Sequence, residues 1–479
     1  MITFFDHPHS GTMAEVAARL GGKGASLWAM THKLGLPVPP GFTIGTEHAA
    51  TALTDTLFAE VLAALEDIGT KLGRRFGDPA NPLLVSVRSG APVSMPGMMD
   101  TFLNVGLTGI HGAALGPPAF VDATRTALRE QFARLLPECD PAVCDDPYAS
   151  LREAINAVYA SWQSSRARSY RAREGISDTL GTAVTIQAMV FGHRDAQSGT
   201  GVVFSRDPST GTPGATSDWL PQAQGEAVVA GTHATQPLAA LARQHPGAYT
   251  ALLAALDRLE LHYRDMVDVE FTIESGQLWI LQARVGKRTS AAAVRIACDL
   301  VDHPEIALSR AEALMRVPRS MSGNDICAQS GANTAVTCGL GVAPGLVSGR
   351  VAVDCDHAIA LADEGHDVIL VRAETSPEDV HGMGVAVGIL TATGGMMSHA
   401  ALVAREWGIA AVCGAPIIID DYGFNAGTTR ITVGDTISID GATGQVFTGA
   451  IVGEAVSNPY RERLRGWASE VTIREKIDG

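Results

Sequence analysis

One stretch constrains the fold more than any other, residues 391–414, with the sequence TATGGMMSHAALVAREWGIAAVCG. A glycine pair precedes a single histidine, His399, and most of the residues after it are good helix formers. The apolar run at residues 387–390 predicts a short buried strand before the glycines. The pattern therefore predicts a strand, a glycine turn and a helix, with Ser398 as the N-cap and His399 in the first helical turn.

The predicted position of His399 has chemical consequences. The N-terminus of a helix offers unpaired N–H groups and the positive end of a dipole, which together stabilise an anion, most often a phosphate. The same field lowers the proton affinity of an imidazole and leaves more of its neutral, nucleophilic form. The glycines let the backbone approach a tetrahedral group closely. Two interpretations stay open here: a histidine that becomes phosphorylated, and a helix-start histidine after an ordinary loop.

A second informative stretch is residues 266–289, MVDVEFTIESGQLWILQARVGKRT. Two strand-like runs meet at a Ser-Gly pair, which predicts a β-hairpin. Asp268 and Glu270 alternate with apolar residues, so both carboxylates lie on one face of the first strand. Such a pair suits Mg²⁺, whose remaining ligands would include phosphate oxygens. Gln282 and Arg284 repeat the spacing on the neighbouring strand, and the alternative is an outward polar face of the hairpin.

Two basic residues in the first hundred are candidates for phosphate binding. Lys23 lies in GGKG, before a helix predicted over residues 25–33, but the spacing of a Walker A motif is absent, so an exposed lysine is the alternative. Residues 83–90, LLVSVRSG, predict a buried strand that carries Arg88 near its end. An arginine there is well placed to bind a phosphate, with a structural salt bridge as the alternative.

Other basic residues receive a structural interpretation. Two amphipathic helices are predicted over residues 119–175, and their charge cluster is interpreted as a solvated face. Its members are Arg166, Arg168, Arg171 and Arg173.

Charge and cysteine usage exclude several classes of function. The formal net charge of -15 argues against a nucleic-acid partner or an anionic membrane surface. No apolar run approaches the roughly 18 residues of a spanning helix, and no secretory signal is evident at the N-terminus. The seven cysteines are scattered without a CxxC pair, which favours reduced thiols in a cytoplasmic protein over a disulfide or zinc framework. A chain of 479 residues is expected to form two to four structural units.

Taken in order, many short motifs make the chain closely resemble the N-terminal portion of the pyruvate phosphate dikinase family. ETSPED and SMPGMMDT resemble this family rather than phosphoenolpyruvate synthase. The matching motifs cover nearly the whole chain and are GGKGASLWAM, LGLPVPPGFTI, VSVRSGAPVSMPGMMDT, QAMVFG, SGTGVVFSRDPSTG, AQGEAVVAG, DVEFTIE, LQARVGKRT, ETSPED and GGMMSHAALVAR.

The resemblance implies a multidomain protein of mixed α/β and α+β class. An ATP-grasp nucleotide-binding domain would be followed by a swivelling α/β phosphohistidine domain, and normally by a barrel that binds pyruvate or phosphoenolpyruvate. Carried over by motif, His399 is the phosphorylated residue and Asp268 joins Glu270 at Mg²⁺. The implied ATP-binding residues are Lys23, Arg88, Asp268, Glu270, Gln282 and Arg284. In the family ATP yields AMP, phosphate enters and pyrophosphate leaves.

The expected domain limits follow from the same resemblance and from loop composition, which marks residues 320–340 as a suitable hinge. The limits are 1–290 for the ATP-grasp domain, 291–337 for a helical linker, 338–455 for the phosphohistidine domain and 456–479 for a tail helix.

The sequence departs from the family pattern at three places. Pro92 stands where an arginine is usual, and Met397 stands where a threonine, regulatory in plant members, is usual. No barrel sequence is present, so the phosphoryl acceptor is expected on a partner subunit, as in the similar phenylphosphate synthase. That acceptor would be pyruvate or an organic hydroxyl such as a phenol or alcohol. A short true dikinase that makes phosphoenolpyruvate, and an adenylate-sensing phosphocarrier without its own product, are the alternatives; homo-oligomerisation is compatible with each.

Overall fold

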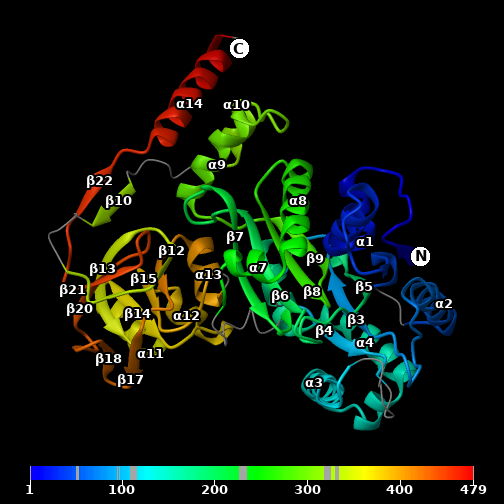
Figure 1. Ribbon diagram of the computed structural model, residues 1–479. Helices are drawn as coiled ribbons and strands as arrows, with labels where there is room; N and C mark the ends of the chain where they lie inside the picture. The colour runs from blue at the N-terminus through cyan, green and yellow to red at the C-terminus, as the bar shows by residue number, and fades with distance from the viewer. Residues whose placement is uncertain are drawn as a thin grey trace. The chain divides into compact units, whose positions relative to one another are not determined.

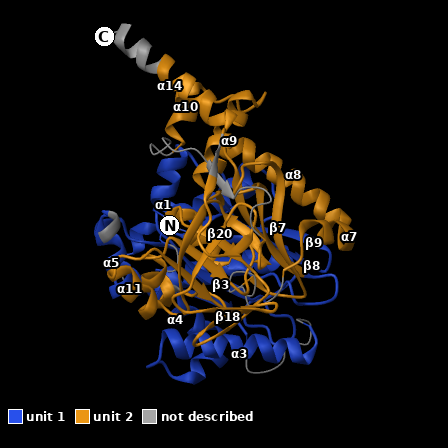
Figure 2. Ribbon diagram, turned by 90° about the vertical axis from the view of Figure 1, so that its left-hand side faces the viewer, with its two compact units in different colours: residues 1–198, 271–283 blue, residues 199–270, 284–479 orange. Residues whose placement is uncertain are grey.

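The computed structural model describes residues 2–49, 53–93, 95, 98–107, 116–225, 235–317, 325–328, 334–396 and 398–477. The chain divides into two compact units, shown in Figure 1 and coloured separately in Figure 2. Unit 1 comprises residues 1–198 and 271–283, and unit 2 comprises residues 199–270 and 284–479. None of the helices in the described ranges combines the length and the apolar character of a membrane-spanning helix.

Unit 1 is built on a five-stranded antiparallel sheet with the order β1-β2-β5-β3-β4. Its strands are β1 (Ile2–Phe4), β2 (Gly41–Ile44), β3 (Val85–Gly90), β4 (Thr101–Val105) and β5 (Ala183–Ala188). β2 and β5 are buried at every position, and their polar residues are paired, as the 3.2 Å between the hydroxyl oxygens of Thr43 and Thr185 shows. The strand predicted over residues 83–90 is confirmed as β3.

Helices surround this sheet and supply most of the apolar core of unit 1. The α-helices are α1 (Met13–Trp28), α2 (Asp55–Leu72), α3 (Pro118–Leu135), α4 (Pro147–Ser161) and α5 (Ser165–Glu174). Shorter turns of helix are η1 (Ala29–Lys33), η2 (Thr46–His48), η3 (Pro141–Asp145) and η4 (Asp178–Leu180). Apolar residues of α2, α3 and α4 form one cluster with the strands, with Val61, Phe102 and Ile186 among its fully buried members.

The helix predicted over residues 25–33 begins earlier than expected. α1 starts at Met13, where Thr12 and Glu15 form a capping box, and it is kinked at Gly21, whose φ is +69°. A Cβ atom at Gly21 would lie 1.7 Å from the carbonyl oxygen of Gly90, so this position requires glycine. The sequence pattern misplaced the helix start because the glycines lie inside the helix and not before it.

The prediction of two helices over residues 119–175 is wrong, because three α-helices, α3, α4 and α5, lie there. The solvated-face interpretation is also wrong for Arg171, which is only 1% exposed. Its guanidinium lies 4.1 Å from the ring centroid of Trp162, and its Nε donates to Asp178 at 2.6 Å. Arg166, in contrast, is exposed as expected.

The first part of unit 2 contributes to a four-stranded sheet with the order β7-β6-β8-β9. The strands are β6 (Gly199–Arg206), β7 (Pro213–Pro221), β8 (Val267–Glu274) and β9 (Gln277–Val285). The predicted hairpin is confirmed, with Ser275 and Gly276 at positive φ between β8 and β9. The division between the units runs through this hairpin, since residues 271–283 belong to unit 1.

Further helices of unit 2 pack on the strands of this sheet or on one another. They are α7 (Leu238–Gln244), α8 (Pro246–Tyr263), α9 (Ser290–Asp302) and α10 (Arg310–Met315). Phe204 of β6 and Met266, directly before β8, form one apolar cluster with Ile296 of α9. Because side chains alternate along a strand, Asp268 and Glu270 lie on the same face as Met266.

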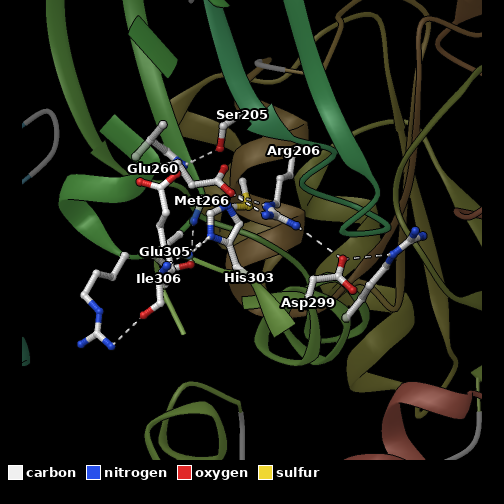
Figure 3. Close-up of polar contacts among 12 residues, drawn as sticks. Ser205, Arg206, Glu260, Met266, Asp299, His303, Glu305 and Ile306 are labelled. Atoms are coloured by element: carbon white, nitrogen blue, oxygen red, sulfur yellow. Dashed lines mark hydrogen bonds and ion pairs between the residues drawn. The ribbon is translucent and has the colours of Figure 1, made fainter. Parts of the chain in front are cut away.

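A buried charge cluster ties β6 to α8 and α9 (Figure 3). Arg206 is 7% exposed, and its Nε donates to Glu260 at 2.8 Å while its Nη1 donates to Asp299 at 3.4 Å. Burial raises the pKa of Asp299, and the positive charge of Arg206 opposes this effect. Beside the cluster, Nδ1 of His303 accepts a hydrogen bond from the backbone N–H of Ile306 at 3.1 Å. The single positive charge of Arg206 is therefore matched by the carboxylates of Glu260 and Asp299.

An eight-stranded mixed sheet forms the larger part of unit 2, with the order β11-β21-β20-β13-β14-β15-β16-β12. β13, β14, β15 and β16 are parallel neighbours at its centre. The strands are β11 (Thr337–Cys338), β12 (Leu340–Ala343), β13 (Leu346–Ala352), β14 (Val368–Arg372), β15 (Gly388–Thr391), β16 (Ala410–Cys413), β20 (Thr436–Asp440) and β21 (Gln445–Thr448).

The two faces of this sheet are covered differently (Figure 1). One face carries α11 (Cys355–Asp363), α12 (Val380–Met383) and α13 (His399–Trp407), with η5 (Pro377–Asp379) before α12. The other face carries a small sheet of β17 (Ile417–Asp420), β18 (Gly423–Ala426) and β19 (Thr429–Thr432). Three alanines of α13, Ala400, Ala401 and Ala404, are buried in the cluster that includes Leu370 of β14.

The remaining elements lie near the C-terminus. β10 (Asp325–Ala328) pairs with β22 (Gly453–Val456), and α14 (Pro459–Ile477) packs on α9 and α10 through Leu464 and Trp467. The expected domain limits stay a prediction. Met397 and parts of the predicted hinge at residues 320–340 lie outside the described residues.

Candidate functional site

His399 is the first residue of α13, directly after β15 and the glycine turn. Ser398 is the N-cap, and its hydroxyl accepts a hydrogen bond from the backbone N–H of Ala401, so the predicted strand, turn and capped helix are confirmed. The imidazole is half-buried, and its Nδ1 lies 3.1 Å from the hydroxyl oxygen of Thr375. In the described residues, Nε2 has no hydrogen-bond partner. Burial lowers the pKa of His399, and the charge of Asp379 opposes that lowering.

These contacts favour one protonation state of His399. An imidazole with a lowered pKa is mostly neutral near pH 7 and carries a single ring proton. If that proton is on Nδ1, it is donated to the hydroxyl of Thr375 and the lone pair of Nε2 is left free. The arrangement is therefore suited to a nucleophile that attacks through Nε2.

Thr375 was not singled out by the sequence analysis, although it lies in the ETSPED motif. That motif forms the short helix η5, where Ser376 and Asp379 make a capping box. Asp379 is also paired with Arg372, at 3.3 Å between Nη2 and Oδ1. The loop is thus fixed by its own hydrogen bonds, and Thr375 is held against His399. The motif itself was the signal that could have identified Thr375.

The turn before His399 is shaped by its glycines and by one arginine of α13. Gly394 has a φ of +104°, which favours glycine, and a Cβ at Gly395 would lie 2.8 Å from both carboxylate oxygens of Asp218. Nη2 of Arg405 donates to the carbonyl oxygen of Met396 at 2.5 Å. The backbone before His399 is consequently held from the same helix that carries the histidine.

A second group of site residues forms around Asp268 on β8. Asp268 is 3% exposed, and its Oδ2 accepts a hydrogen bond from Nε of Arg284 at 2.8 Å and forms an ion pair with Nη2 of the same residue at 2.7 Å. Its Oδ1 is buried without a hydrogen-bond partner. Burial raises the pKa of Asp268, and the adjacent Arg284 opposes this effect. Burial therefore contradicts the interpretation of Asp268 as part of an outward polar face.

The donor set around Asp268 fits a hard divalent cation. A buried carboxylate oxygen without a partner has a free lone pair, and Glu270 presents a second, half-buried carboxylate on the same strand face. Mg²⁺ prefers such oxygen ligands and completes its shell with water and phosphate oxygens. The described residues contain no group of three or more His, Cys, Asp or Glu side chains that could hold a metal without further ligands. Asp268 and Glu270 would therefore hold Mg²⁺ together with a phosphate ligand.

In unit 1 the other predicted ATP-binding residues converge on the end of β3. Nη2 of Arg88 lies 3.5 Å from Oε1 of Gln282, a long hydrogen bond. Lys23 lies beside the same strand, because a Cβ placed on Gly90 would lie 3.5 Å from the Cβ of Lys23. The backbone N–H of Gly22 donates to the carbonyl oxygen of Ala91 at 2.9 Å, which fixes the kinked turn of α1 there. Unit 1 thus gathers Lys23, Arg88 and Gln282.

Unit 2 gathers the remaining candidates. α13 packs on the sheet that carries Asp268, since Leu402 packs against the apolar cluster of that sheet. Nζ of Lys287, just after β9, lies 2.5 Å from Glu406 of α13. Asp268, Glu270, Arg284 and His399 therefore belong to one packed unit.

Two protein families match parts of this chain. Residues 53–249 and 245–303 match the family described as "Pyruvate phosphate dikinase, AMP/ATP-binding domain", and residues 364–444 match "PEP-utilising enzyme, mobile domain". The first match includes the Asp268 group, and the second includes His399 and Thr375.

Individual relatives are similar over most of this chain. It is 39% identical over 517 residues to pyruvate, phosphate dikinase of Clostridium symbiosum, covering 94% of this chain and 59% of the relative. It is 39% identical over 510 residues to that of Rhizobium meliloti, covering 91% and 56%, and 39% identical over 521 residues to the chloroplastic protein of Flaveria pringlei, covering 95% and 54%. The chain thus spans between half and two thirds of the length of these relatives.

Proposed function

The chain belongs to the pyruvate phosphate dikinase family, and we propose that it uses ATP to phosphorylate its own His399. The observation that carries the proposal is the contact of Nδ1 with Thr375, which leaves Nε2 as the nucleophile at the N-terminus of α13. The names of the relatives support a dikinase reaction, in which the phosphorylated histidine is an intermediate.

The proposed step balances as follows. Nε2 of His399 attacks a phosphorus atom of ATP, a P–N bond forms, and the P–O bond to the leaving nucleotide breaks with its electron pair on that oxygen. The ring proton stays on Nδ1, where Thr375 accepts it in a hydrogen bond. If AMP leaves, both outer phosphates of ATP pass to His399, and inorganic phosphate then removes the outer one as pyrophosphate. If ADP leaves, only one phosphoryl group is transferred.

The charged residues stabilise the phosphates. Arg284 is fixed in orientation by Asp268, and its guanidinium suits a phosphate oxygen. Lys23, Arg88 and Gln282 are also assigned to ATP binding in this proposal, in keeping with phosphoryl transfer by positioning and charge neutralisation. Mg²⁺, when held by Asp268 and Glu270, would neutralise phosphate charge.

We propose that the phosphoryl group then passes to a small acceptor, pyruvate or an organic hydroxyl, bound on a separate subunit. The second matched family description names a mobile domain, which is compatible with delivery of the phosphoryl group to a second site. A dikinase that itself makes phosphoenolpyruvate is the alternative that the names of the relatives favour. A cytoplasmic location is part of the proposal, and the free cysteines of the described residues support a reducing compartment.

The test is the intact mass of the purified chain after incubation with ATP and Mg²⁺, with and without inorganic phosphate. We expect an acid-labile addition of two phosphoryl groups without phosphate and of one with it. The His399→Ala variant should show none, whereas His357→Ala, which removes an exposed histidine, should behave as the original chain. A single addition in both conditions would indicate ADP as the leaving group. Binding of ATP without any addition would contradict the proposal and favour an adenylate-sensing protein.

A further inference from the structure

Two arginines are buried in unit 2, and their surroundings differ. Arg206 is paired with two carboxylates (Figure 3). Arg405 of α13 is 3% exposed and makes one hydrogen bond, from Nη2 to the carbonyl oxygen of Met396. Its Nε and Nη1 are buried without a hydrogen-bond partner, and it forms no ion pair with any residue in the described ranges. Arg405 is thus a buried cation whose charge is unmatched by direct contacts.

The position of Arg405 is fixed by its neighbours on the sheet. Its guanidinium carbon lies 5.6 Å from the ring centroid of Phe204 on β6. Phe204 belongs to one apolar cluster with Met266, and Asp268, two residues further along, lies on the same face as Met266 because side chains alternate along a strand. Arg405 therefore lies over the strand pair that carries Asp268.

The buried carboxylate of Asp268 complements the unmatched guanidinium of Arg405. Its Oδ1 is a buried acceptor without a partner, while Nε and Nη1 of Arg405 are buried donors without partners. Burial lowers the pKa of Arg405 to about 10, and nearby carboxylates, including that of Asp268, oppose this effect. The two groups thus influence each other without forming a contact.

Buried N–H donors of Arg405 and a buried acceptor of Asp268, all without partners, indicate a ligand that carries both negative and positive charge. A phosphate with its divalent cation is such a ligand, because the cation takes a carboxylate oxygen and a phosphate oxygen takes guanidinium N–H groups. We propose that Arg405 binds a phosphate oxygen of ATP and so belongs to the nucleotide site, although it is supplied by the helix that carries His399. This inference rests on the proposed function.

The competing account is that Arg405 only holds the carbonyl oxygen of Met396. That role uses one of its five N–H donors and leaves the burial of Nε and Nη1 unexplained. It also predicts that ATP affinity is independent of Arg405 when His399 is absent. The two accounts are therefore separated by a binding measurement.

The experiment measures ATP binding by titration calorimetry in the His399→Ala background, with and without Mg²⁺, so that no phosphorylation occurs. Arg405→Gln should weaken ATP binding in the presence of Mg²⁺ by roughly 10- to 100-fold, because a charge-assisted hydrogen bond is lost. The matched control is Arg463→Gln, which removes an arginine that is stacked on Trp467 but already paired with Asp302, and it should leave the affinity unchanged.

A lysine variant keeps the test decisive if the glutamine variant does not fold. Arg405→Lys retains the charge, so it should be folded by circular dichroism and should restore part of the ATP affinity. Unchanged ATP affinity in either folded variant would overturn the proposal and leave Arg405 as a loop anchor.

Failure of the proposed function is a separate result. In that case the chain with His399 and Arg405 intact would show no mass addition with ATP, whatever the affinities of the variants.

Discussion

His399 and Asp268 belong to the same unit, but their surroundings differ in burial and in the polar partners that they provide. His399 is half-buried, has one hydrogen-bond partner on its ring and is held in its neutral form by burial. Asp268 is buried and already paired with Arg284 through a hydrogen bond and an ion pair. A nucleophile needs a free lone pair, whereas a binding site for charge needs its dipoles and charges fixed before the ligand arrives. We therefore expect His399 to attack the phosphorus atom and the residues around Asp268 to stabilise the charge of the phosphates.

The largest effect is expected at the region that fixes charge. Asp268→Asn keeps the side-chain shape but removes the charge that orients Arg284 and would hold Mg²⁺. The rate of His399 phosphorylation should fall by roughly 10²- to 10³-fold, as for loss of one preorganised electrostatic group. The measurement is single-turnover labelling followed by intact mass across a range of Mg²⁺ concentrations.

An exposed ion pair supplies the control for that variant. Asp302 is paired with Arg463 at 2.5 Å but is 57% exposed, and such pairs contribute little. Asp302→Asn should leave the labelling rate within about twofold of the original, in line with that small contribution. Equal labelling rates for the Asp268 and Asp302 variants would contradict the role of Asp268 in charge stabilisation.

A smaller effect is expected at the nucleophile. Thr375→Val removes the hydroxyl beside Nδ1 while keeping the side-chain shape. Loss of a hydrogen bond worth about 1 kcal/mol corresponds to roughly a five- to tenfold slower labelling rate, with ATP affinity unchanged. Thr375→Ser retains the hydroxyl and should retain most of the rate. Full activity of the valine variant would show that Nδ1 needs no partner.

The smallest expected effect is in pH dependence. Burial lowers the pKa of His399 from its usual value of 6.5, so more than half of its imidazole is neutral at pH 6.5. The neutral fraction falls only as the pH drops through the lowered pKa, so the labelling rate should rise with pH through that pKa and then level off. Titration by NMR of ¹³C-labelled histidine, with His399→Gln to assign the signal, reports this pKa directly. A midpoint above 6.5 would contradict the effect of burial.

Local signals in the sequence were sufficient for the site elements that depend on neighbours in the chain. Ser398 caps its own helix, and the turn at Ser275 and Gly276 joins two strands that pair with each other. The spacing of Asp268 and Glu270 placed both on one face because strand geometry alternates. Each of these predictions needed only a few consecutive residues.

Properties that arise from tertiary packing were beyond the sequence. Arg171 and Arg405 have the composition of solvated helix residues, yet both are buried because other elements cover them. The kink at Gly21 depends on the approach of Gly90, almost seventy positions away. Thr375 meets His399 through the fold of the loop between β14 and β15, one strand earlier in the chain. Burial and long-range contacts, and not local propensity, decide these cases.

The alanines beneath His399 set its height above the sheet. Ala400, Ala401 and Ala404 are the fully buried residues of α13 in the apolar cluster that includes Leu370 of β14, and their small side chains let the helix lie close to the central strands. A larger residue at any of these positions would lift the imidazole as a rigid body, and a displacement of about 1 Å at a reacting atom can cost roughly 100-fold in rate. The small side chains on the buried side of α13 thus set the position of the reacting nitrogen, and substitutions there should be tolerated only for side chains no bigger than a methyl group.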